Sequence, residues 1–247
     1  MKAPRLDEWL VENNHYPTRA KARDAILRGC ITFKDNLEAK PSRKVSNPDL
    51  VTINDPNLKL VSRAGLKLKA ALEHTGYSPN GKIALDLGAS TGGFCQVLLN
   101  EGARHVYAID VGHGQLDASL VSHPALTNHE KLNCRDLKLE HCDSNAPQFI
   151  TSDVSFISLK LALPSALEIA DKGAVGIFLI KPHFEVGKQG LGKGGIVRDE
   201  TLLVETAQSV ADWLNNFPGW SVTHFMSSPI AGGDGNKEFL MAGLKNE

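Results

Sequence analysis

The sequence predicts an α/β fold in which a mostly parallel sheet follows a small α+β segment. From about residue 62 onwards, short apolar runs alternate with stretches of helical periodicity, which is typical of parallel strands buried on both faces. The last two apolar runs are separated only by a short, turn-rich connection, which favours an antiparallel hairpin at the end of the sheet. Residues 1–50 differ in pattern and in charge, which suggests a separate appendage.

The N-terminal segment reads as two helices and a small sheet. Apolar residues at helical spacing between Leu6 and Leu10 predict a first helix. Thr18 can cap a second helix, and Gly29 is suited to end it. Two short strands and a turn complete the segment, at Ile31–Phe33, Val51–Ile53 and Lys34–Asn36.

The predicted parts of the chain are a small domain at residues 1–54, a linker at 55–61 and a large domain at 62–247. The turn formers of Asn54-Asp55-Pro56-Asn57 mark the linker. In the large domain we expect helices at 62–74, 93–100, 159–169 and 199–216, and strands at 83–87, 106–109, 149–152, 175–180, 220–226 and 239–244.

Composition and charge limit the possible classes of function. The chain is 42% hydrophobic and 22% charged, as in ordinary globular proteins. No apolar run is long enough to span a bilayer, and no secretory signal is visible, so we expect a cytoplasmic protein that does not enter membranes. Residues 1–50 hold ten Lys and Arg against seven Asp and Glu, which favours a polyanionic partner. The four cysteines form no zinc pattern, so we expect free thiols and no metal: Cys30, Cys95, Cys134 and Cys142.

The most informative segment is a glycine-rich turn after the apolar run at 83–87. Glycines there allow a ligand to approach the backbone, and the following helix offers unpaired N–H groups. The turn matches neither the dinucleotide fingerprint nor the P-loop, and the first mismatch argues against a nicotinamide-linked reductase. The residues expected to contact the ligand are Gly88, Ala89, Ser90, Thr91, Gly92, Gly93 and Phe94.

Acidic residues near this turn favour S-adenosylmethionine as the ligand. Asp86 stands just before the glycines, where it can bind the cationic amino group of the cofactor directly or through water. Asp110 ends the next strand and can accept hydrogen bonds from ribose hydroxyls. Asp136 is a candidate for the adenine amino group, although a solvated loop acid is the competing interpretation.

Four further segments carry two lysines and two acids in a fixed order. They are Ser62–Leu68, Ser152–Phe156, Ile180–Glu185 and Gly235–Leu240, and they contribute Lys67, Asp153, Lys181 and Glu238. The order and contexts resemble the RrmJ/FtsJ-like ribose 2′-O-methyltransferases. The resemblance implies a Rossmann-like class I methyltransferase domain with S-adenosylmethionine as cofactor.

The resemblance is closest to the TlyA branch, historically called hemolysin A, and it covers nearly the whole chain. Arg5–Val11 and Thr18–Arg23 look like the helices of an S4 RNA-binding domain, and Gly192–Asp199 also looks like a TlyA segment. One departure is His183, where glutamine is more usual. The family implies ribosomal RNA or ribosomal subunits as partner and a cytidine 2′-hydroxyl as methyl acceptor. A monomer is the default expectation.

The chemistry gives the four residues expected roles. A ribose hydroxyl is a weak nucleophile, so Lys181 is expected to act as its base or to orient it. Asp153 and Glu238 would position the two lysines, with Asp153 also beside the methyl end of the cofactor. Lys67 could instead hold a phosphate or the hydroxyl oxygen. RNA contacts are expected from the following cations: Arg5, Arg19, Lys21, Arg23, Arg28 and Arg63.

Two alternatives belong to other classes of function. The historical name of the family suggests a membrane-active hemolysin, which the sequence supports little, because it has no spanning segment and no strongly amphipathic basic helix. A ribosome-assembly protein that binds RNA without catalysis is the other alternative. The intact cofactor turn and the four Lys and acid positions argue against it.

Overall fold

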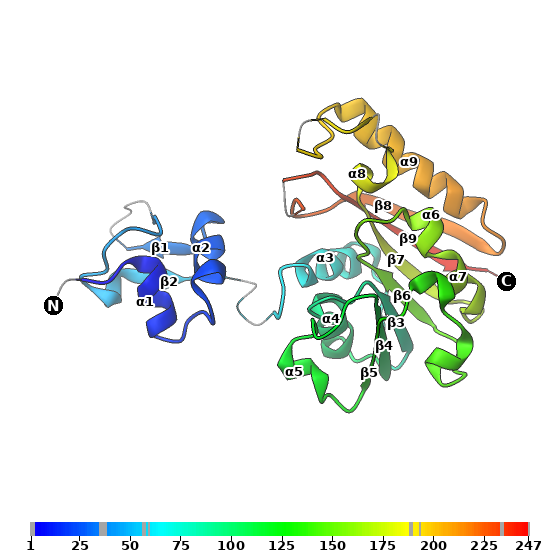
Figure 1. Ribbon diagram of the computed structural model, residues 1–247, viewed down its shortest axis with the longest axis horizontal. Coiled ribbons are helices and arrows are strands. Elements are labelled where there is room, and N and C mark those ends of the chain that lie inside the picture. Colours follow the sequence, from blue (N-terminus) through cyan, green and yellow to red (C-terminus); the bar gives the residue numbers. More distant parts are fainter. Residues whose placement is uncertain are drawn as a thin grey trace. The chain divides into compact units, whose positions relative to one another are not determined.

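The protein is described by a computed structural model that covers residues 3–34, 39–55, 58, 60–187, 190–192, 194–232 and 235–246. The chain divides into two compact units, residues 1–60 and 61–247, which are drawn in Figure 1. Each unit has its own hydrophobic core. Asp35, Asn36, Pro56 and Asn57, which the sequence places in a turn and in the linker, lie outside the described residues.

The N-terminal unit packs two helices against a two-stranded antiparallel sheet. The Thr18 hydroxyl accepts a hydrogen bond from the backbone N–H of Lys21, and Gly29 follows the second helix with a φ of +76°. Ile31 pairs with Ile53 across the sheet. Asp55, expected in the linker, belongs to this unit, because its carboxylate accepts hydrogen bonds from Arg28 and Tyr16. The elements are α1 (Leu6–Glu12), α2 (Arg19–Leu27), β1 (Ile31–Phe33), the 3-10 helix η1 (Pro48–Leu50) and β2 (Val51–Ile53).

The large unit is built on a seven-stranded sheet in the order β5-β4-β3-β6-β7-β9-β8. The first five strands of this order are parallel, whereas β9 pairs antiparallel with both of its neighbours. This confirms the expected mostly parallel sheet with an antiparallel end. The strands are β3 (Ile83–Leu87), β4 (His105–Asp110), β5 (Leu126–Glu130), β6 (Phe149–Ser152), β7 (Val175–Ile180), β8 (Trp220–Ser227) and β9 (Phe239–Lys245).

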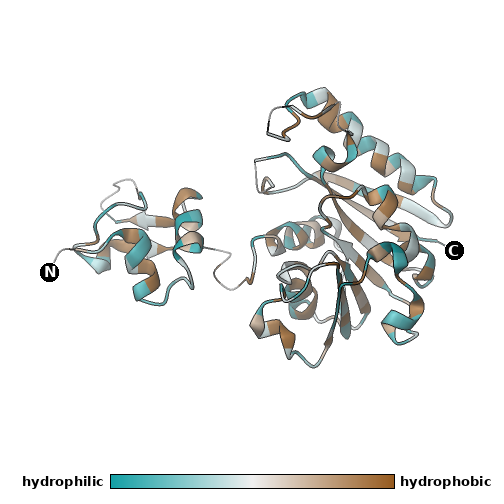
Figure 2. Cartoon of the chain, viewed as in Figure 1, coloured by the Kyte–Doolittle hydropathy of each residue, from teal (hydrophilic) through white to brown (hydrophobic). Residues whose placement is uncertain are grey.

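Helices lie on both faces of the sheet (Figure 1). Alternate residues of β3 point to opposite faces: Leu85 enters a core with β7 and α9, whereas Asp86 faces α4. α9 alternates between hydrophobic and hydrophilic residues in Figure 2, as expected for a helix with one buried side. The helices are α3 (Gly65–Thr75), α4 (Gly93–Asn100), α5 (Ala118–Val121), α6 (Leu159–Ala162), α7 (Pro164–Ile169), α8 (Pro182–Glu185) and α9 (Glu200–Asn215), with the 3-10 helices η2 (Cys134–Asp136) and η3 (Leu139–Cys142).

Several elements differ from the expectations, including the short helices α5 and α8, which were not expected. The single helix expected at 159–169 is two short helices, because Pro164 begins α7 and cannot donate a backbone hydrogen bond to the turn before it. The edge strand β5 was not expected at all. Four of its five residues are only partly buried, so it lacks the apolar run that marks the central strands.

The order of the strands fixes the place of a site. From β3 the chain continues to β4 on one side, and later returns to β6 on the other side. Ligands of open α/β sheets bind at such a reversal, outside the carboxyl ends of the strands. The start of β9 reaches the same edge, because Phe239 pairs with Ile180 at the end of β7.

Candidate active site

Three cavities lie at this edge of the sheet. Cavity A, of about 670 Å³, is lined by residues that follow β3, β4 and β6. Cavity B, of about 230 Å³, lies between the glycine turn, the start of α3 and Lys181. Cavity C, of about 410 Å³, is bounded by Lys181, Asn236 and Glu238. Ser155 lines all three cavities, so they meet beside it.

The glycine turn forms a wall shared by cavities A and B. Gly88 and Ser90 line both cavities. Gly88 has a φ of +78°, and a Cβ atom there would lie 2.9 Å from the Cα atom of Val154. The turn therefore requires glycine for its conformation and for its close contact with the segment after β6. Of the other expected residues, Gly92 is the N-cap of α4 and lines none of the three cavities. Cavity B is lined by Ala89, Thr91, Gly93 and Phe94.

Asp110 joins the end of β4 to the glycine turn and lines cavity A. One carboxylate oxygen accepts a hydrogen bond of 2.7 Å from the Ser90 N–H, and the other accepts one of 2.7 Å from the Gly112 N–H. Each oxygen keeps a second lone pair. The carboxylate is thus fixed in orientation while it can still accept hydrogen bonds from a ligand in cavity A.

Asp86 lies below the glycine turn, and its residue surface is fully buried. Its carboxylate accepts hydrogen bonds from the Thr151 hydroxyl at 2.7 Å and from the Cys95 thiol at 3.1 Å. It lines none of the three cavities. Asp86 is therefore not placed for the direct contact with a cofactor amino group, and the contact through water stays a prediction. Its carboxylate ties β3 to β6 and α4.

Asp86 should make the stability of the large unit depend on pH. Burial raises the pKa of Asp86 to about 7, although hydrogen bonds from Cys95 and Thr151 act in the opposite direction. The folded protein therefore holds this proton at pH values where the unfolded chain, with an ordinary carboxyl pKa of about 3.9, has released it. We expect the contribution of Asp86 to the free energy of unfolding to fall as pH rises from about 4 to about 7.

The substitution Asp86→Asn removes this titration and tests the expectation. Urea unfolding at pH 5, 6 and 7 should show a steeper decline for the wild type than for the variant, by a few kcal/mol over the range. Parallel declines would mean that Asp86 does not take up the proton on folding.

Asp136, the expected contact for the adenine amino group, is exposed at the end of η2 and lines no cavity. Its neighbours Asn133, Cys134 and Arg135 line cavity A instead. The geometry thus favours the solvated-acid interpretation of Asp136 and moves the candidate contact to the residues just before it.

The two expected lysines and two expected acids come together as two ion pairs. Lys181 Nζ lies 2.6 Å from Asp153 Oδ1, and Lys67 Nζ lies 2.6 Å from Glu238 Oε2. The side chains of Lys67 and Glu238 are 8% and 3% exposed, so this pair is almost removed from water. Four segments widely separated in sequence therefore place their charges at one edge of the sheet.

Ser155 is a neighbour of Lys181 that the sequence analysis did not identify. Its hydroxyl oxygen lies 2.8 Å from Lys181 Nζ, and the Asp153 carbonyl lies 3.2 Å from the same atom. With Asp153 Oδ1, these acceptors satisfy the three donors of an ammonium group. Phe156, which follows Ser155, is 91% exposed with a φ of +66°. A bulky residue with this backbone conformation points to a constrained, functional turn.

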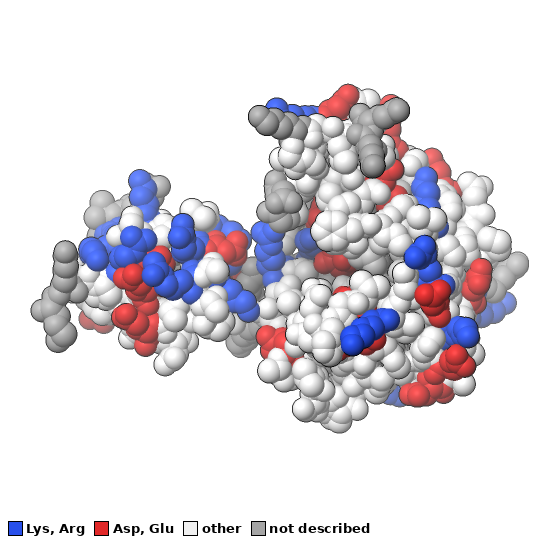
Figure 3. Space-filling view, viewed as in Figure 1, with Lys and Arg blue, Asp and Glu red and all other residues white. Residues whose placement is uncertain are grey.

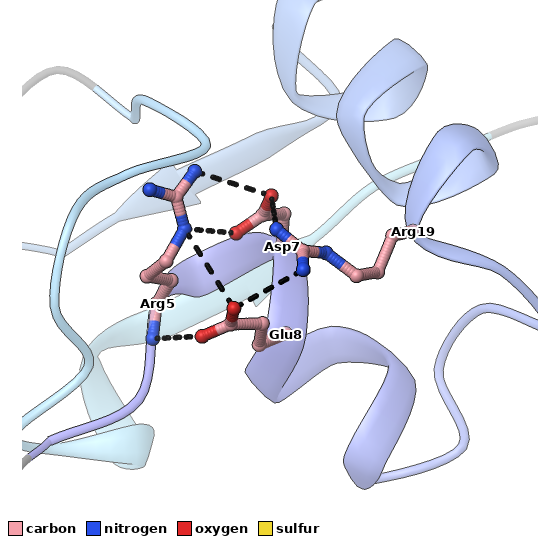
Figure 4. A network of polar contacts seen from close by, with 4 residues as sticks. All are labelled: Arg5, Asp7, Glu8 and Arg19. Carbon is pink, nitrogen blue, oxygen red and sulfur yellow. Dashed lines mark hydrogen bonds and ion pairs between the residues drawn. The ribbon is translucent and has the colours of Figure 1, made fainter.

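The cations expected to bind RNA lie in different environments. Arg63 lines cavity B, beside Lys67. Arg5 and Arg19 both bind the buried carboxylate of Asp7, at 3.0 and 2.9 Å, and both also approach Glu8 (Figure 4). Burial would raise the pKa of Asp7, but the hydrogen bonds from the two arginines leave it below its ordinary value. Arg19 therefore holds α2 to α1, and Arg5 is held at the start of α1, so both are engaged within the unit as well as carrying charge.

Arg28 is also engaged within the N-terminal unit. Its guanidinium contacts Asp24 at 2.8 Å and Asp55 at 2.9 Å. Arg23 and Lys21 lie on the exposed part of α2. Figure 3 shows Lys and Arg side chains gathered on the N-terminal unit, with acids between them. Fewer of these cations are therefore available to bind a polyanion than the number of Lys and Arg residues suggests.

Metal sites and membrane-spanning helices are both absent from the part of the chain that the structure describes. No group of three or more His, Cys, Asp or Glu side chains is arranged to hold a metal ion. None of the described helices combines the length and apolar character needed to cross a membrane.

Comparison with known proteins gives the relatives of the chain. Hemolysin A of Brachyspira hyodysenteriae is 37% identical over 236 residues, which cover 96% of this chain and 98% of that protein. The 16S/23S rRNA (cytidine-2′-O)-methyltransferase TlyA of Mycobacterium tuberculosis is 37% identical over 238 residues, covering 96% and 88%. The corresponding 23S rRNA enzyme of Campylobacter jejuni is 34% identical over 245 residues, covering 96% and 92%.

Solved structures and a family profile agree with these relatives. A Streptococcus thermophilus protein described as a hemolysin is 35% identical, with a TM-score of 0.77, and the match covers 100% of this chain and 90% of that one. An O-methyltransferase of Bacillus cereus shares the fold at 16% identity and a TM-score of 0.51, covering 74% and 82%. The profile of the FtsJ-like methyltransferases matches residues 60–245. The chain therefore belongs to the FtsJ-like methyltransferase family.

Proposed function

We propose that this chain methylates the ribose 2′-hydroxyl of a cytidine in ribosomal RNA. The observation that carries the proposal is the arrangement of Lys67, Asp153, Lys181 and Glu238 as two ion pairs where cavities A, B and C meet. The relatives from M. tuberculosis and C. jejuni are named for this reaction. An rRNA substrate also implies that the protein works in the cytoplasm. All four residues come from one chain, so we propose that a monomer forms the complete site.

The residues around cavity A fit S-adenosylmethionine, the methyl donor of this family. The backbone at Gly88 packs so closely on Val154 that a Cβ atom would contact the Val154 backbone. Each carboxylate oxygen of Asp110 keeps a lone pair that can accept a hydrogen bond from a ligand in the cavity. Gly88, Ser90 and Asp110 would hold the nucleoside end, and Asn133 would lie beside the base. When bound, the cofactor supplies a methyl group on a positively charged sulfur.

Lys181 is the residue placed to act on the acceptor hydroxyl. Its ammonium group is held by Asp153 and Ser155, so its direction is fixed before RNA arrives. To act as a base, Lys181 must first release a proton to water. A ribose hydroxyl that takes the place of the Ser155 oxygen would then donate its proton to the neutral amine as its oxygen takes the methyl group. Lys67, which lines cavity B, and its partner Glu238, which lines cavity C, would orient the ribose or its phosphate.

The test of this function is methyl transfer to separated ribosomal subunits from a strain that lacks the protein. Purified protein and radiolabelled S-adenosylmethionine should label the RNA of at least one subunit. Cofactor binding without any label in RNA would instead support the non-catalytic RNA-binding alternative, which the present geometry does not favour.

The N-terminal unit is proposed to be an S4-like RNA-binding domain. Arg23 is its best contact with phosphate, because it is exposed on α2 whereas Arg5, Arg19 and Arg28 are paired with acids. We expect Arg23→Glu to weaken RNA binding and to reduce the slope of log affinity against log salt concentration by about 2, since one phosphate contact is lost and a repulsion is gained. Arg19→Ala is the contrasting variant, which should mainly destabilise the N-terminal unit.

Filter binding at several salt concentrations measures the first effect, and thermal unfolding of the N-terminal unit measures the second. An unchanged affinity and slope for Arg23→Glu would rule out a phosphate contact by this residue.

A membrane-damaging activity is the second candidate, because one relative carries the name Hemolysin A. Leakage from liposomes treated with purified protein would support it. Intact liposomes together with labelled RNA would assign the protein to methyl transfer alone.

A further inference from the structure

Cavity C is not accounted for by a cofactor in cavity A. Its volume of about 410 Å³ lies within the range of small-ligand pockets. It shares Ser155 and Phe156 with cavity A, and Ser155 and Lys181 with cavity B. A ribose held at Lys181 would therefore have cavity C on one of its sides. Cavity C therefore adjoins the place where the acceptor ribose would be held.

The walls of cavity C suit a flat, uncharged ring. Phe156 and Phe184 have ring centroids 5.1 Å apart, and His183 packs on Phe184 at 4.1 Å. The two charged residues of the lining, Lys181 and Glu238, are already paired with Asp153 and Lys67. Among the described residues of this lining no cation is available, and aromatic walls of this kind favour a nucleobase over a phosphate.

Asn236 supplies a buried polar group to the lining of cavity C. The residue is 4% exposed, and among the described residues its Oδ1 atom has no hydrogen-bond partner. A buried amide oxygen without a donor is costly, and such groups in native proteins call for an explanation. A ligand that carries an N–H donor into cavity C would satisfy it.

We propose that cavity C binds the base of the target nucleotide, and that Asn236 Oδ1 accepts a hydrogen bond from the 4-amino group of cytosine. This inference rests on the proposed function, because it takes a ribose at Lys181 for granted. Uracil carries an oxygen acceptor at the same position. Two acceptors would then face each other in a buried site, so Asn236 becomes the residue that selects cytidine over uridine.

The experiment compares ribosomal subunits that carry the target cytidine with subunits in which it is replaced by uridine. The wild-type protein should methylate cytidine with a kcat/KM about tenfold to a hundredfold higher. For Asn236→Ala, kcat/KM on cytidine should fall by a similar factor, and the values for cytidine and uridine should become nearly equal. Asn236→Asp should retain the preference, because a carboxylate also accepts from the amino group. Asn246→Ala, at an exposed position, is the matched control.

The possible outcomes distinguish a failure of the proposed base subsite from a failure of the proposed function. Equal rates of the wild type on both substrates would overturn the subsite and leave the function standing, whatever the folding of the variants. Weaker cofactor binding by Asn236→Ala, in proportion to its loss of rate, would assign cavity C to the cofactor instead. No methylation of native subunits by the wild type would overturn the proposed function, and the subsite with it.

Discussion

Lys181→Ala is expected to reduce the rate of methyl transfer by about 10²–10⁴-fold while cofactor binding changes little. The amine is the group placed to take or orient the hydroxyl proton, and no other side chain occupies its position between Asp153 and Ser155 among the described residues. Cavity A, where the cofactor fits, is not lined by Lys181. Single-turnover rates and calorimetric titration of S-adenosylmethionine measure the two quantities separately.

Two further variants make this prediction sharper. Lys181→Arg keeps the positive charge but cannot act as a base, because a guanidinium does not lose its proton in proteins. Loss of methyl transfer in Lys181→Arg would support a role of Lys181 in proton transfer. Substantial activity of Lys181→Arg would mean that Lys181 only orients the hydroxyl through its charge. Lys172→Ala, at an exposed lysine, is the control. Full turnover by Lys181→Ala would remove this residue from the mechanism.

Gly88→Ala is expected to abolish measurable cofactor binding and to destabilise the large unit. The added Cβ atom would lie 2.9 Å from the Cα and 3.0 Å from the N atom of Val154, so backbone must move. The φ of +78° adds a conformational cost of about 1–2 kcal/mol, and the forced contact adds about 1–3 kcal/mol. The displaced turn would carry Ser90 away from Asp110.

Gly81→Ala is the matched control, because its φ of +69° is similar and its Cβ would meet nothing within 4 Å. It should show the conformational cost alone, with unchanged affinity for S-adenosylmethionine. Equal loss of affinity in both variants would mean that general destabilisation, and not the close contact at Gly88, explains the result. Thermal unfolding and cofactor titration of the two variants provide the comparison.

Features encoded by neighbouring residues were predicted from the sequence. The end of α2 at Gly29, the small sheet at 31–33 and 51–53, and the glycine turn after β3 all depend on local propensities and on hydrophobic periodicity. The antiparallel last strands followed from the short connection between two apolar runs. The edge strand β5 was missed because most of its residues are partly exposed and show no apolar pattern.

The candidate site was predictable only where a motif marked it. Lys67 and Glu238 stand far apart in sequence, and the resemblance to a family, not their spacing, grouped them. The pairing of Arg19 with Asp7 depends on how α1 packs against α2, so the sequence overestimated the charge available for RNA. Ser155 and Asn236 carry no sequence signal. Their importance follows from contacts and burial that only the folded chain has.

The most direct test of the account is the identity of the methylated nucleoside. RNA labelled by the wild-type protein is digested to nucleosides and separated by chromatography with 2′-O-methylated and base-methylated standards. The arrangement around Lys181 predicts that the label runs with 2′-O-methylcytidine. Label in a nucleoside methylated on its base would contradict the assignment of the two ion pairs to ribose methylation, although the protein would still be a methyltransferase.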